Sequence, residues 1–450
     1  MVLFLFYTAP LRFRRYLLLL ASYVFYMFWK PVFIFLILTL TAIDYFAGLW
    51  IERTLGSRRI WALWVSLAAN LGFLGFFKYT NFLIDNVAWI AGVSPATYHL
   101  ALILPLGISF HTFQSISYVV DVYRGQQKAV HDPIDYALFI AFFPQLVAGP
   151  IVRAGEFFGD LWHWRSPTVP EAYQGASLIL TGLVKKIVLA DQFAAVADGY
   201  FNAVASTPGT PAAWSGVAAF AMQIFFDFSG YTDIAIGCAL LFGFHFPVNF
   251  RRPYLSQSLT EFWSRWHISL SRWLRNYVYI PLGGNRQGSV GTYRNLILTM
   301  LIGGLWHGAS WNFVIWGGYH GTILAVERAL GVKKEEPARS FYFGWLRTLL
   351  TFGLVCVGWV FFRAHTLGDS LLTMRRMFTF ENGGFLLEKR HIAFMAVALV
   401  LALVEERRHL LERLGSAPVW AHAVGVALVL AAVEIFGVTD RSIPFVYFQF

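Results

Sequence analysis

The sequence predicts an all-helical protein that crosses a membrane many times, and three observations support this prediction. Of the 450 residues, 57% are hydrophobic and 13% are charged, whereas a soluble chain is near one quarter charged. Apolar runs close to the roughly twenty residues of a membrane-spanning helix recur from end to end. These runs do not alternate apolar and polar residues, which argues against a β-barrel.

The apolar runs give the positions of the expected helices. In chain order they are 16–29, 31–51, 60–77, 101–120, 172–190, 212–226, 232–246, 295–306, 312–330, 343–362, 392–404 and 419–435. Because several are short, we expect tilted, broken or re-entrant helices among them, and about eleven crossings in all. The polar segments between the runs are too short for a soluble domain, so residues 1–450 are expected to form a single membrane domain.

The basic residues indicate orientation and exclude one class of partner. The first two runs meet at a tight turn at 29–31, and arginines flank their outer ends at 12–15 and 53–59. Lys and Arg favour the cytoplasmic side, so both flanks are expected there. The net charge of +10 is spread singly or in pairs over such boundaries. Membrane lipid headgroups are a sufficient partner for it, and no nucleic acid is expected.

Several common catalytic patterns are missing from the sequence. Cys238 and Cys356 lie inside apolar runs and are interpreted as small core residues, not as a disulfide or a metal site. There is no Gly-Lys dipeptide for a phosphate-binding loop, no Gly-x-Ser-x-Gly and no His-Glu-x-x-His. We therefore expect neither a bound metal nor a bound cofactor.

The stretch 258–285 holds the largest group of displaced polar residues, and reads SLTEFWSRWHISLSRWLRNYVYIPLGGN. A lipid-facing helix could not hold these charges, each of which costs about 2.5–3.5 kcal/mol or more at mid-bilayer. Thr260 and Glu261 are typical of a helix start, and the Pro-Leu-Gly-Gly at 281–284 of its end. These signals predict a helix between them.

Spacing within this helix suggests which side chains meet. Glu261 and Arg265 are four residues apart and can pair, as can His267 and Ser271. For the arginines alone, an amphipathic helix lying at the membrane interface is an equally good interpretation. For His267, between Trp266 and Ile268, a buried cavity position is expected.

A second stretch, 301–321, reads LIGGLWHGASWNFVIWGGYHG. His307 ends an apolar run and is followed by small residues, which let a helix or a ligand approach the backbone closely. A lone histidine on an apolar face is usually a core residue, but an intramembrane ionisable group is also a functional candidate. His320 has a similar setting, and the glycines around it suggest helix packing.

Other embedded polar groups have structural and catalytic interpretations. In FFDFSGYTDIA, Asp227 and Asp233 flank Gly230, where we expect a helix break, with the carboxylates either capping the new helix ends or acting in catalysis. His111 is ambiguous between the two roles, and Lys185 with Lys186 is interpreted as an interfacial boundary.

These residues offer a buried general base in a membrane protein, and acyl transfer is one reaction that such a base can serve. Histidine is a general base near neutral pH and can take a proton from a hydroxyl that attacks a carbonyl. Transfer of an acyl group from a thioester also needs a donor to the oxyanion. His307 and His267 can divide these roles, with Asn312 or Asn276 assisting.

At these residues the chain resembles the membrane-bound O-acyltransferase family, in its branch of bacterial alginate and exopolysaccharide O-acetyltransferases. EFWSRWHISLSRWLRNYVYIPLGGNR and GGLWHGASWNFVIWGGYHG are similar to the two signature regions. FFKYTNF, LPLGISFHTFQSISYVVDVYRG, FPQLVAGPIVR, FDFSGYTDIAIG and the terminal FVYFQF are further matching pieces. The resemblance covers nearly the whole chain.

The resemblance implies a fold of tilted helices around a central tunnel, with catalytic residues at His307 and His267. If the two share a cavity, their imidazoles must lie within about 15 Å, a few water links of roughly 3 Å each. The residues expected to line the substrate site and tunnel are Glu261, Arg265, Trp266, Arg275, Asn276, Trp306 and Asn312. Arg251 and Arg252 are interpreted as an electropositive mouth for the donor, although such pairs are commonly lipid anchors.

Two functional hypotheses follow. The first is an O-acetyltransferase of the bacterial inner membrane. It would pass acetyl from cytosolic acetyl-CoA to an extracytoplasmic polysaccharide such as alginate, or to a periplasmic acetyltransferase partner with a Ser nucleophile. The second is a transporter or channel in which embedded His, Asp and Arg line a pathway. An inverted internal repeat would favour the transporter, and the sequence shows none, so the enzyme is the preferred hypothesis.

Overall fold

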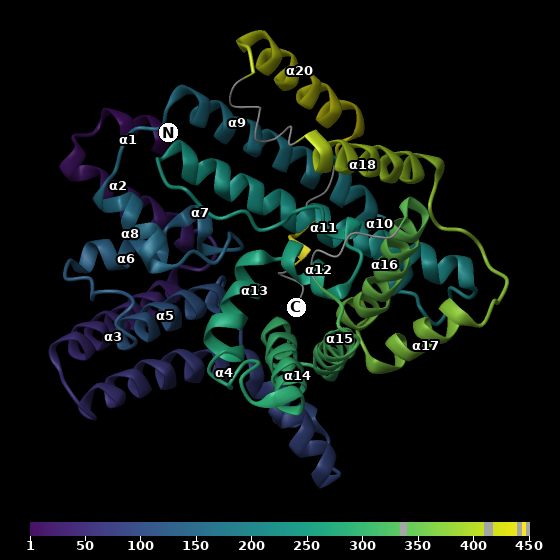
Figure 1. The fold of residues 1–450 in the computed structure, drawn as a ribbon, viewed down its shortest axis with the longest axis horizontal. Helices are drawn as coiled ribbons and strands as arrows, with labels where there is room; N and C mark the ends of the chain where they lie inside the picture. The colour runs from purple at the N-terminus through teal and green to yellow at the C-terminus, as the bar shows by residue number, and fades with distance from the viewer. Residues whose placement is uncertain (334–339, 409–416, 439–442, 447–450) are drawn as a thin grey trace. The chain divides into compact units, whose positions relative to one another are not determined.

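The computed structural model describes residues 1–333, 340–408, 417–438 and 443–446, and the regular elements within these ranges are helices. The chain divides into two compact units. The first comprises Met1–Thr168 with Cys238–Pro247, and the second comprises Val169–Gly237 with Val248–Phe450. Figure 1 shows the course of the chain.

The first unit contains the amino-terminal helices. They are α1 (Val2–Thr8), α2 (Leu11–Met27), η1 (Pro31–Phe33), α3 (Ile34–Arg53), α4 (Arg58–Ala91), η2 (Pro95–Thr97), α5 (Ile108–Tyr123), α6 (Pro133–Ala141), α7 (Phe143–Leu146) and α8 (Ala154–Trp162). Helix α5 packs against α3, α4 and α6 and is buried on nearly all sides. A helix surrounded in this way forms the core of its unit.

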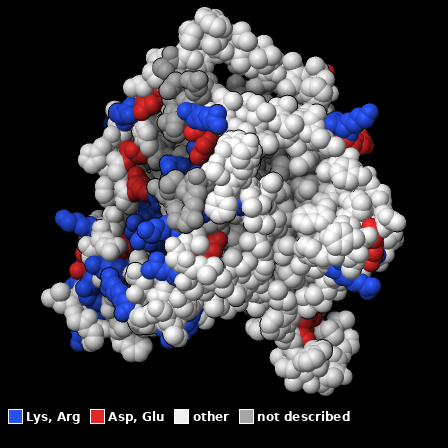
Figure 2. All heavy atoms as spheres, turned by 45° about the vertical axis from the view of Figure 1, so that its right-hand side comes forward, with Lys and Arg blue, Asp and Glu red and all other residues white. Residues whose placement is uncertain are grey.

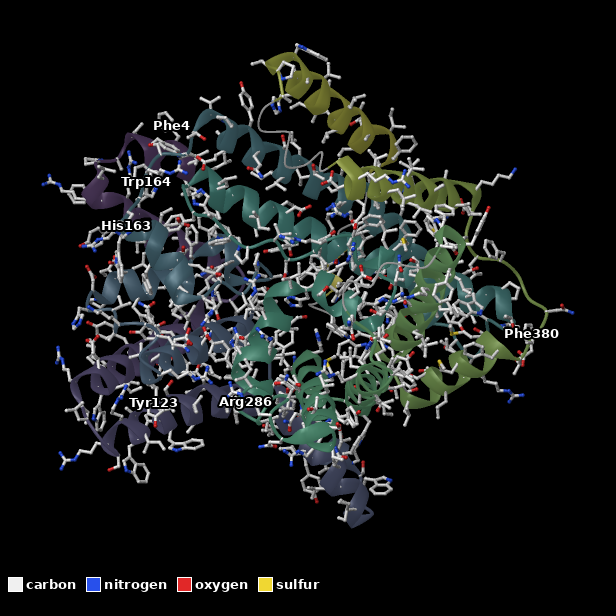
Figure 3. The ribbon with its side chains drawn as sticks, viewed as in Figure 1. Phe4, Tyr123, His163, Trp164, Arg286 and Phe380 are labelled. Carbon is white, nitrogen blue, oxygen red and sulfur yellow. The ribbon has the colours of Figure 1, made fainter. Side chains whose placement is uncertain are left out.

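Two local features of this unit follow from particular residues. The helix expected at 101–120 begins only at Ile108, because Gly107 adopts a left-handed φ of 69° and lies against the carbonyl of Leu146, where a Cβ would be 2.5 Å from the oxygen. Near the chain start, the guanidinium of Arg14 lies 4.5 Å from the ring centroid of Trp164, which Figure 3 labels. This cation–π contact joins α2 to the segment after α8.

The second unit contains the remaining helices. They are α9 (Val169–Leu183), η3 (Val184–Ala190), α10 (Asp191–Phe201), α11 (Thr210–Leu241), η4 (Pro253–Leu255), α12 (Leu259–Arg265), α13 (Ile268–Leu274), η5 (Arg275–Tyr279), α14 (Gly288–His307), α15 (Trp311–Ala329), α16 (Phe341–Arg363), α17 (Leu367–Phe378), α18 (Lys389–Arg408) and α20 (Val419–Phe436). The last four residues of α11 belong to the first unit.

Helix α11 corrects the expected helix break at Gly230, because the helix runs unbroken from Thr210 to Leu241. Gly230 serves close packing: a Cβ there would lie 2.8 Å from the carbonyl oxygen of Gly182 on α9. The carboxylates are held by lysines and do not cap helix ends. Asp233 pairs with Lys185 at 2.6 Å, and Asp227 pairs with Lys186 at 2.9 Å. The two lysines are therefore ion-pair partners inside the unit.

Glycines also set the approach of α14 and α15, which pack together and lie side by side in Figure 1. A Cβ at Gly304 would lie 2.2 Å from the carbonyl oxygen of Phe313, and one at Gly317 would lie 2.4 Å from that of Met300. Small residues at such contacts allow helix backbones to approach closely. The packing role expected for the glycines near His320 is confirmed at Gly317.

Five helical segments of the described residues are long and apolar enough to cross a membrane. They are Pro31–Arg53, Arg58–Ala91, Thr210–Leu241, Phe341–Arg363 and Val419–Phe436. Helix α4, with 34 residues, is about 51 Å long at 1.5 Å per residue, longer than the hydrocarbon core of about 30 Å. It must therefore tilt or project. On the face drawn in Figure 2, charged side chains gather in a few places and leave broad uncharged areas.

Candidate functional site

The stretch 258–285 forms two short helices and a π-helical turn where the sequence predicts one helix. The start is as expected, since Ser258 Oγ accepts a hydrogen bond from the backbone N–H of Glu261 at 3.1 Å. The chain then leaves the helix at Trp266. His267 adopts a left-handed conformation with φ 43° and ψ 55° before α13 begins. The expected continuous helix is therefore wrong at His267.

Asn249 explains this break. Its side-chain Oδ1 accepts hydrogen bonds from the backbone N–H of Ser269 at 3.1 Å and from Ser269 Oγ at 2.9 Å, and it lies within hydrogen-bond distance of His267 Nδ1 at 3.2 Å. Its backbone carbonyl accepts the N–H of Ile268 at 2.9 Å. These hydrogen bonds take the place of helical ones and stabilise the non-helical backbone conformation between α12 and α13. Asn249 is fully buried, and a polar residue inside the apolar segment FPVNF was the available signal for it.

Aromatic rings enclose His267. Its imidazole lies edge-on to Phe228 with ring centroids 4.8 Å apart, nearly parallel to Phe250 at 6.4 Å, and 6.2 Å from Trp306. The residue is fully buried. The expectation of a buried position for His267 is confirmed.

His307 ends α14 and is 7% exposed. Its imidazole contacts the rings of Trp306 at 4.8 Å, Phe362 at 5.0 Å and Trp316 at 5.2 Å. The next residue must be small, since a Cβ at Gly308 would lie 2.0 Å from the ring of Phe313. The small residues after His307 thus let α15 fold back over it.

The structure brings His267 and His307 against the same tryptophan. Because their ring centroids lie 6.2 Å and 4.8 Å from that of Trp306, the two imidazole centroids are at most about 11 Å apart. This separation is below the limit of about 15 Å that was expected for two imidazoles sharing a cavity. Trp306 itself is 5% exposed, so the three rings form one largely buried group.

His320 belongs to the same aromatic cluster. Its imidazole lies 4.8 Å from Trp316 and 5.3 Å from Trp263 and is 1% exposed. A Cβ at Gly358 would lie 2.6 Å from its Nε2. Trp316 also contacts His307, so both histidines touch the same indole.

Two other expected site residues have clear structural contacts. Asn312 donates from Nδ2 to the carbonyl oxygen of Ala364 at 2.9 Å and is 5% exposed, so it joins the start of α15 to the end of α16. Trp266 is 1% exposed and lies 5.6 Å from Phe262 and 5.0 Å from Trp359. Both residues are packed inside the unit.

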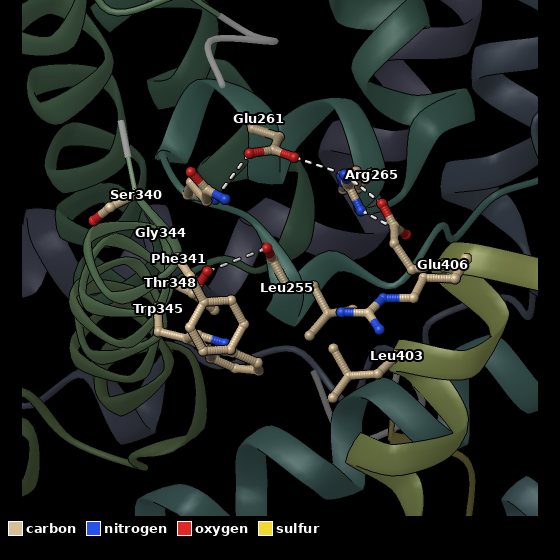
Figure 4. Close-up of a pocket in the computed structure, with 12 residues that line it drawn as sticks. Leu255, Glu261, Arg265, Ser340, Phe341, Gly344, Trp345, Thr348, Leu403 and Glu406 are labelled. Carbon is tan, nitrogen blue, oxygen red and sulfur yellow. Dashed lines mark hydrogen bonds and ion pairs between the residues drawn. The ribbon is translucent and has the colours of Figure 1, made fainter. Parts of the chain in front are cut away.

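A charged cavity of about 490 Å³ lies beside α12 and is lined from α12, α16 and α18 (Figure 4). The predicted pair is present, with Arg265 Nη2 at 2.7 Å from Glu261 Oε1. Arg265 also donates to both carboxylate oxygens of Glu406, at 3.1 and 3.0 Å. Burial alone would raise the pKa of Glu406, but the hydrogen bonds and charges of Arg265 and Arg252 outweigh it and lower the pKa below its usual value. The carboxylate is therefore held ionised.

The two arginines of the expected donor mouth differ in their surroundings. Arg252 is paired with Glu405 at 3.5 Å and with Glu406, so an incoming phosphate would compete with carboxylates. Arg251 has an exposed side chain. Arg275 is also exposed and begins the π-helical turn η5, in which Asn276 is partly buried.

His111 lies in the first unit, fully buried in α5. Cys238 and Cys356 are free thiols. Among the described residues, no group of His, Cys, Asp and Glu is arranged to hold a metal ion. What the histidine cluster offers is two buried imidazoles in an aromatic setting, where proton transfer and electrostatic stabilisation act strongly.

Comparison with known proteins shows the family of this chain. A model described as the membrane-bound O-acyltransferase family matches residues 60–362. A probable alginate O-acetylase AlgI of Azotobacter vinelandii is 46% identical over 389 residues, which are 84% of this chain and 75% of the relative. The probable alginate O-acetylase AlgI of Pseudomonas aeruginosa is 47% identical over 383 residues, 84% of this chain and 72% of the relative.

A peptidoglycan O-acetyltransferase of Helicobacter pylori is 40% identical over 401 residues, 81% of this chain and 74% of the relative. The family match includes both histidine regions and more than half of the chain. It favours the enzyme over the transporter, and it confirms the resemblance drawn from the sequence motifs. The chain belongs to the membrane-bound O-acyltransferase family and is an acyltransferase.

Proposed function

We propose that this acyltransferase moves acetyl from cytosolic acetyl-CoA across the membrane for O-acetylation of a cell-surface polysaccharide such as alginate. The observation that carries the proposal is the placement of His267 and His307 against the same buried indole, Trp306. Relatives named as alginate O-acetylases and as a peptidoglycan O-acetyltransferase support acetyl as the acyl group and a glycan as its destination.

His307 is proposed as the catalytic base. It takes the proton of the acceptor hydroxyl, whose oxygen attacks the thioester carbonyl carbon. The tetrahedral intermediate then expels the coenzyme A thiolate, which takes a proton from the imidazolium. His267, which lies near the same indole, orients a reacting group. The acceptor is the polysaccharide or the Ser hydroxyl of a periplasmic acetyltransferase partner.

The remaining site residues are proposed in supporting roles. Those lining the tunnel are Glu261, Arg265, Trp266, Arg275, Asn276, Trp306 and Asn312. Arg251 is the better candidate for the donor mouth, since Arg252 is already paired with carboxylates. We further propose that residues 1–450 act as one domain with about eleven crossings around a tunnel in the bacterial inner membrane. Five segments of the described residues that meet the length and hydropathy of a span support a multi-pass protein.

The test has two measurements: the release of coenzyme A by the purified protein in detergent, and the acetyl content of the surface glycan in cells. Wild-type protein is expected to release coenzyme A from acetyl-CoA slowly, and faster with an acceptor glycan or partner. His307→Ala should abolish the release and the acetylation of the surface glycan while the protein still accumulates in the membrane.

His163→Ala is the matched control, because the His163 side chain is exposed and its Nδ1 lies 3.1 Å from the carbonyl oxygen of Gly159 in the preceding helix α8, in the unit that does not contain His307. It should behave like wild type. Unchanged acetyl content in the His307→Ala strain would exclude His307 as the base. Uptake of intact acetyl-CoA into sealed vesicles, without thioester cleavage, would contradict the proposed reaction.

A further inference from the structure

The orientation of the Asn249 amide is decided by its neighbours. The backbone N–H of Ser269 can only donate, and it lies 3.1 Å from the atom assigned as Asn249 Oδ1. An amide flip would place an NH₂ group against this N–H, two donors facing each other. The oxygen therefore occupies this position.

This orientation fixes the proton on His267. The same Oδ1 lies 3.2 Å from His267 Nδ1. A carbonyl oxygen can only accept, so Nδ1 must carry the hydrogen. In a neutral imidazole the other nitrogen is then the acceptor, and the tautomer is set by the hydrogen bond at Nδ1.

The backbone around His267 is held by the same residue. His267 adopts a left-handed conformation, which brings the Cβ of a non-glycine residue too close to the following carbonyl oxygen. The N–H of Ile268 donates to the Asn249 carbonyl at 2.9 Å, and Phe228 and Phe250 flank the imidazole. Asn249 thus fixes the ring's protonation as well as its position.

We propose that Asn249 is a positioning residue that holds His267 as the Nδ1–H tautomer, so that His267 acts through Nε2 as a hydrogen-bond acceptor. Its partner is then a donor group of the substrate other than the hydroxyl whose proton His307 takes, such as a neighbouring hydroxyl of a glycan acceptor, and neutral His267 does not donate to the oxyanion. This assignment rests on the proposed acyl transfer for its catalytic meaning. It narrows the division of roles between the two histidines, which the sequence leaves open.

Two substitutions distinguish the hydrogen-bond acceptor of the Asn249 side chain from the volume that this side chain fills. Asn249→Asp keeps an oxygen that accepts from Nδ1, and should keep the tautomer and most of the activity. Asn249→Leu keeps a similar volume without an acceptor, and should lower kcat about 10–100-fold, as expected for a misplaced catalytic group. The KM for acetyl-CoA should change little. Asn202→Leu, at an exposed asparagine, is the matched control and should leave activity unchanged.

Variants at His267 test the same assignment. His267→Gln places an amide near the position of Nε2, whereas His267→Asn places one near Nδ1. The proposal predicts that an amide oxygen near Nε2 preserves more activity than an amide near Nδ1. Higher activity for His267→Asn than for His267→Gln would contradict the role of Nε2.

The decisive readout is nitrogen-15 NMR of histidine-labelled protein in lipid, with the His267 signals identified by their loss in His267→Asn. The expected result is a protonated Nδ1 and an unprotonated Nε2 in wild type and in Asn249→Asp. A protonated Nε2 in wild type would overturn the proposal, even if Asn249→Leu fails to fold. Failure of the proposed function is distinct, since it would appear as no coenzyme A release whatever the tautomer.

Discussion

The imidazole of His307 packs edge-on against the indole of Trp316, with ring centroids 5.2 Å apart and planes at 84°. The same indole also contacts the imidazole of His320, with ring centroids 4.8 Å apart. Edge-to-face pairs of this kind have a preferred geometry, so a shift of one ring is passed to the next. The position of the candidate base therefore depends on residues that lie two rings away from it.

The first prediction concerns Gly358, which faces His320 from α16. A Cβ at Gly358 would lie 2.6 Å from His320 Nε2, whereas one at Gly353, on the same helix, meets nothing within 4 Å. Gly358→Ala should push His320 into Trp316, destabilise the protein by about 1–3 kcal/mol and reduce acetyl transfer. Thermal unfolding and coenzyme A release measure the two effects.

Gly353→Ala is the matched control for this change. It adds the same methyl group to the same helix in open space, and alanine is the better helix former by roughly 0.5–1 kcal/mol. Its activity should equal that of wild type. Equal behaviour of Gly358→Ala and Gly353→Ala would show that the cluster does not depend on His320.

The second prediction compares neighbouring glycines of α15. At Gly317 a Cβ would meet the backbone oxygen of Met300 at 2.4 Å, and backbone cannot move aside cheaply. At Gly318 the nearest atom is the side-chain Cδ2 of Leu301 at 3.6 Å, an ordinary contact. Gly317→Ala should separate α14 from α15 and lower the amount of folded protein in the membrane, while Gly318→Ala should not. Quantitative immunoblotting of membranes decides it, and equal amounts of both variants would reject the close-packing argument.

The sequence predicted those parts of the site that depend on local spacing. The Glu261–Arg265 pair follows from a separation of four residues on a helix, and the structure contains it at 2.7 Å. Burial of His307 follows from the apolar run before it. These features require only a few neighbouring residues, and a single turn of helix is enough to produce them.

The sequence did not predict features that depend on distant partners. The helix break at His267 is produced by Asn249, eighteen residues upstream, and no local signal opposed a continuous helix. The unbroken course of α11 depends on Lys185 and Lys186, which neutralise Asp233 and Asp227 from another helix. In both places a tertiary hydrogen bond or ion pair overrode the local pattern.

The third prediction concerns Lys186, which holds two buried carboxylates. Its Nζ lies 2.7 Å from Asp191 and 2.9 Å from Asp227, whose side chains are 7% and 3% exposed. Lys186→Met should remove the cation paired with Asp227 and cost about 3–5 kcal/mol, as expected for breaking a buried pair. The measurement is the midpoint of thermal unfolding in detergent.

Lys185→Met is the matched control, since Lys185 pairs with Asp233 and the two side chains are 21% and 17% exposed. Its cost should be smaller. Adding Asp227→Asn to Lys186→Met should restore part of the loss, because one uncompensated charge is removed. A double variant no more stable than Lys186→Met would argue against the ion pair as the source of the effect.

The last prediction is a pH dependence of stability at Glu406, which lies beyond the apolar run of α18. Arg265 and Arg252 lower the pKa of Glu406 below its ordinary value of 4.5, against the opposing effect of burial. A carboxylate with a depressed pKa in the folded state stabilises the protein fully above its ordinary pKa. This contribution is lost as the pH falls through the folded-state value. Glu406→Gln should therefore unfold at a lower temperature than wild type at pH 7, and the difference should shrink as the pH falls below 4.5.

Because the Glu406 side chain is 34% exposed, solvent screening limits each of its pairs to about 0.2–1 kcal/mol. Glu388→Gln, which removes a pair with the exposed Arg390, should show little difference at any pH. A Glu406→Gln difference that stays constant from pH 7 to below 4.5 would show that the carboxylate is not stabilised in its charged form.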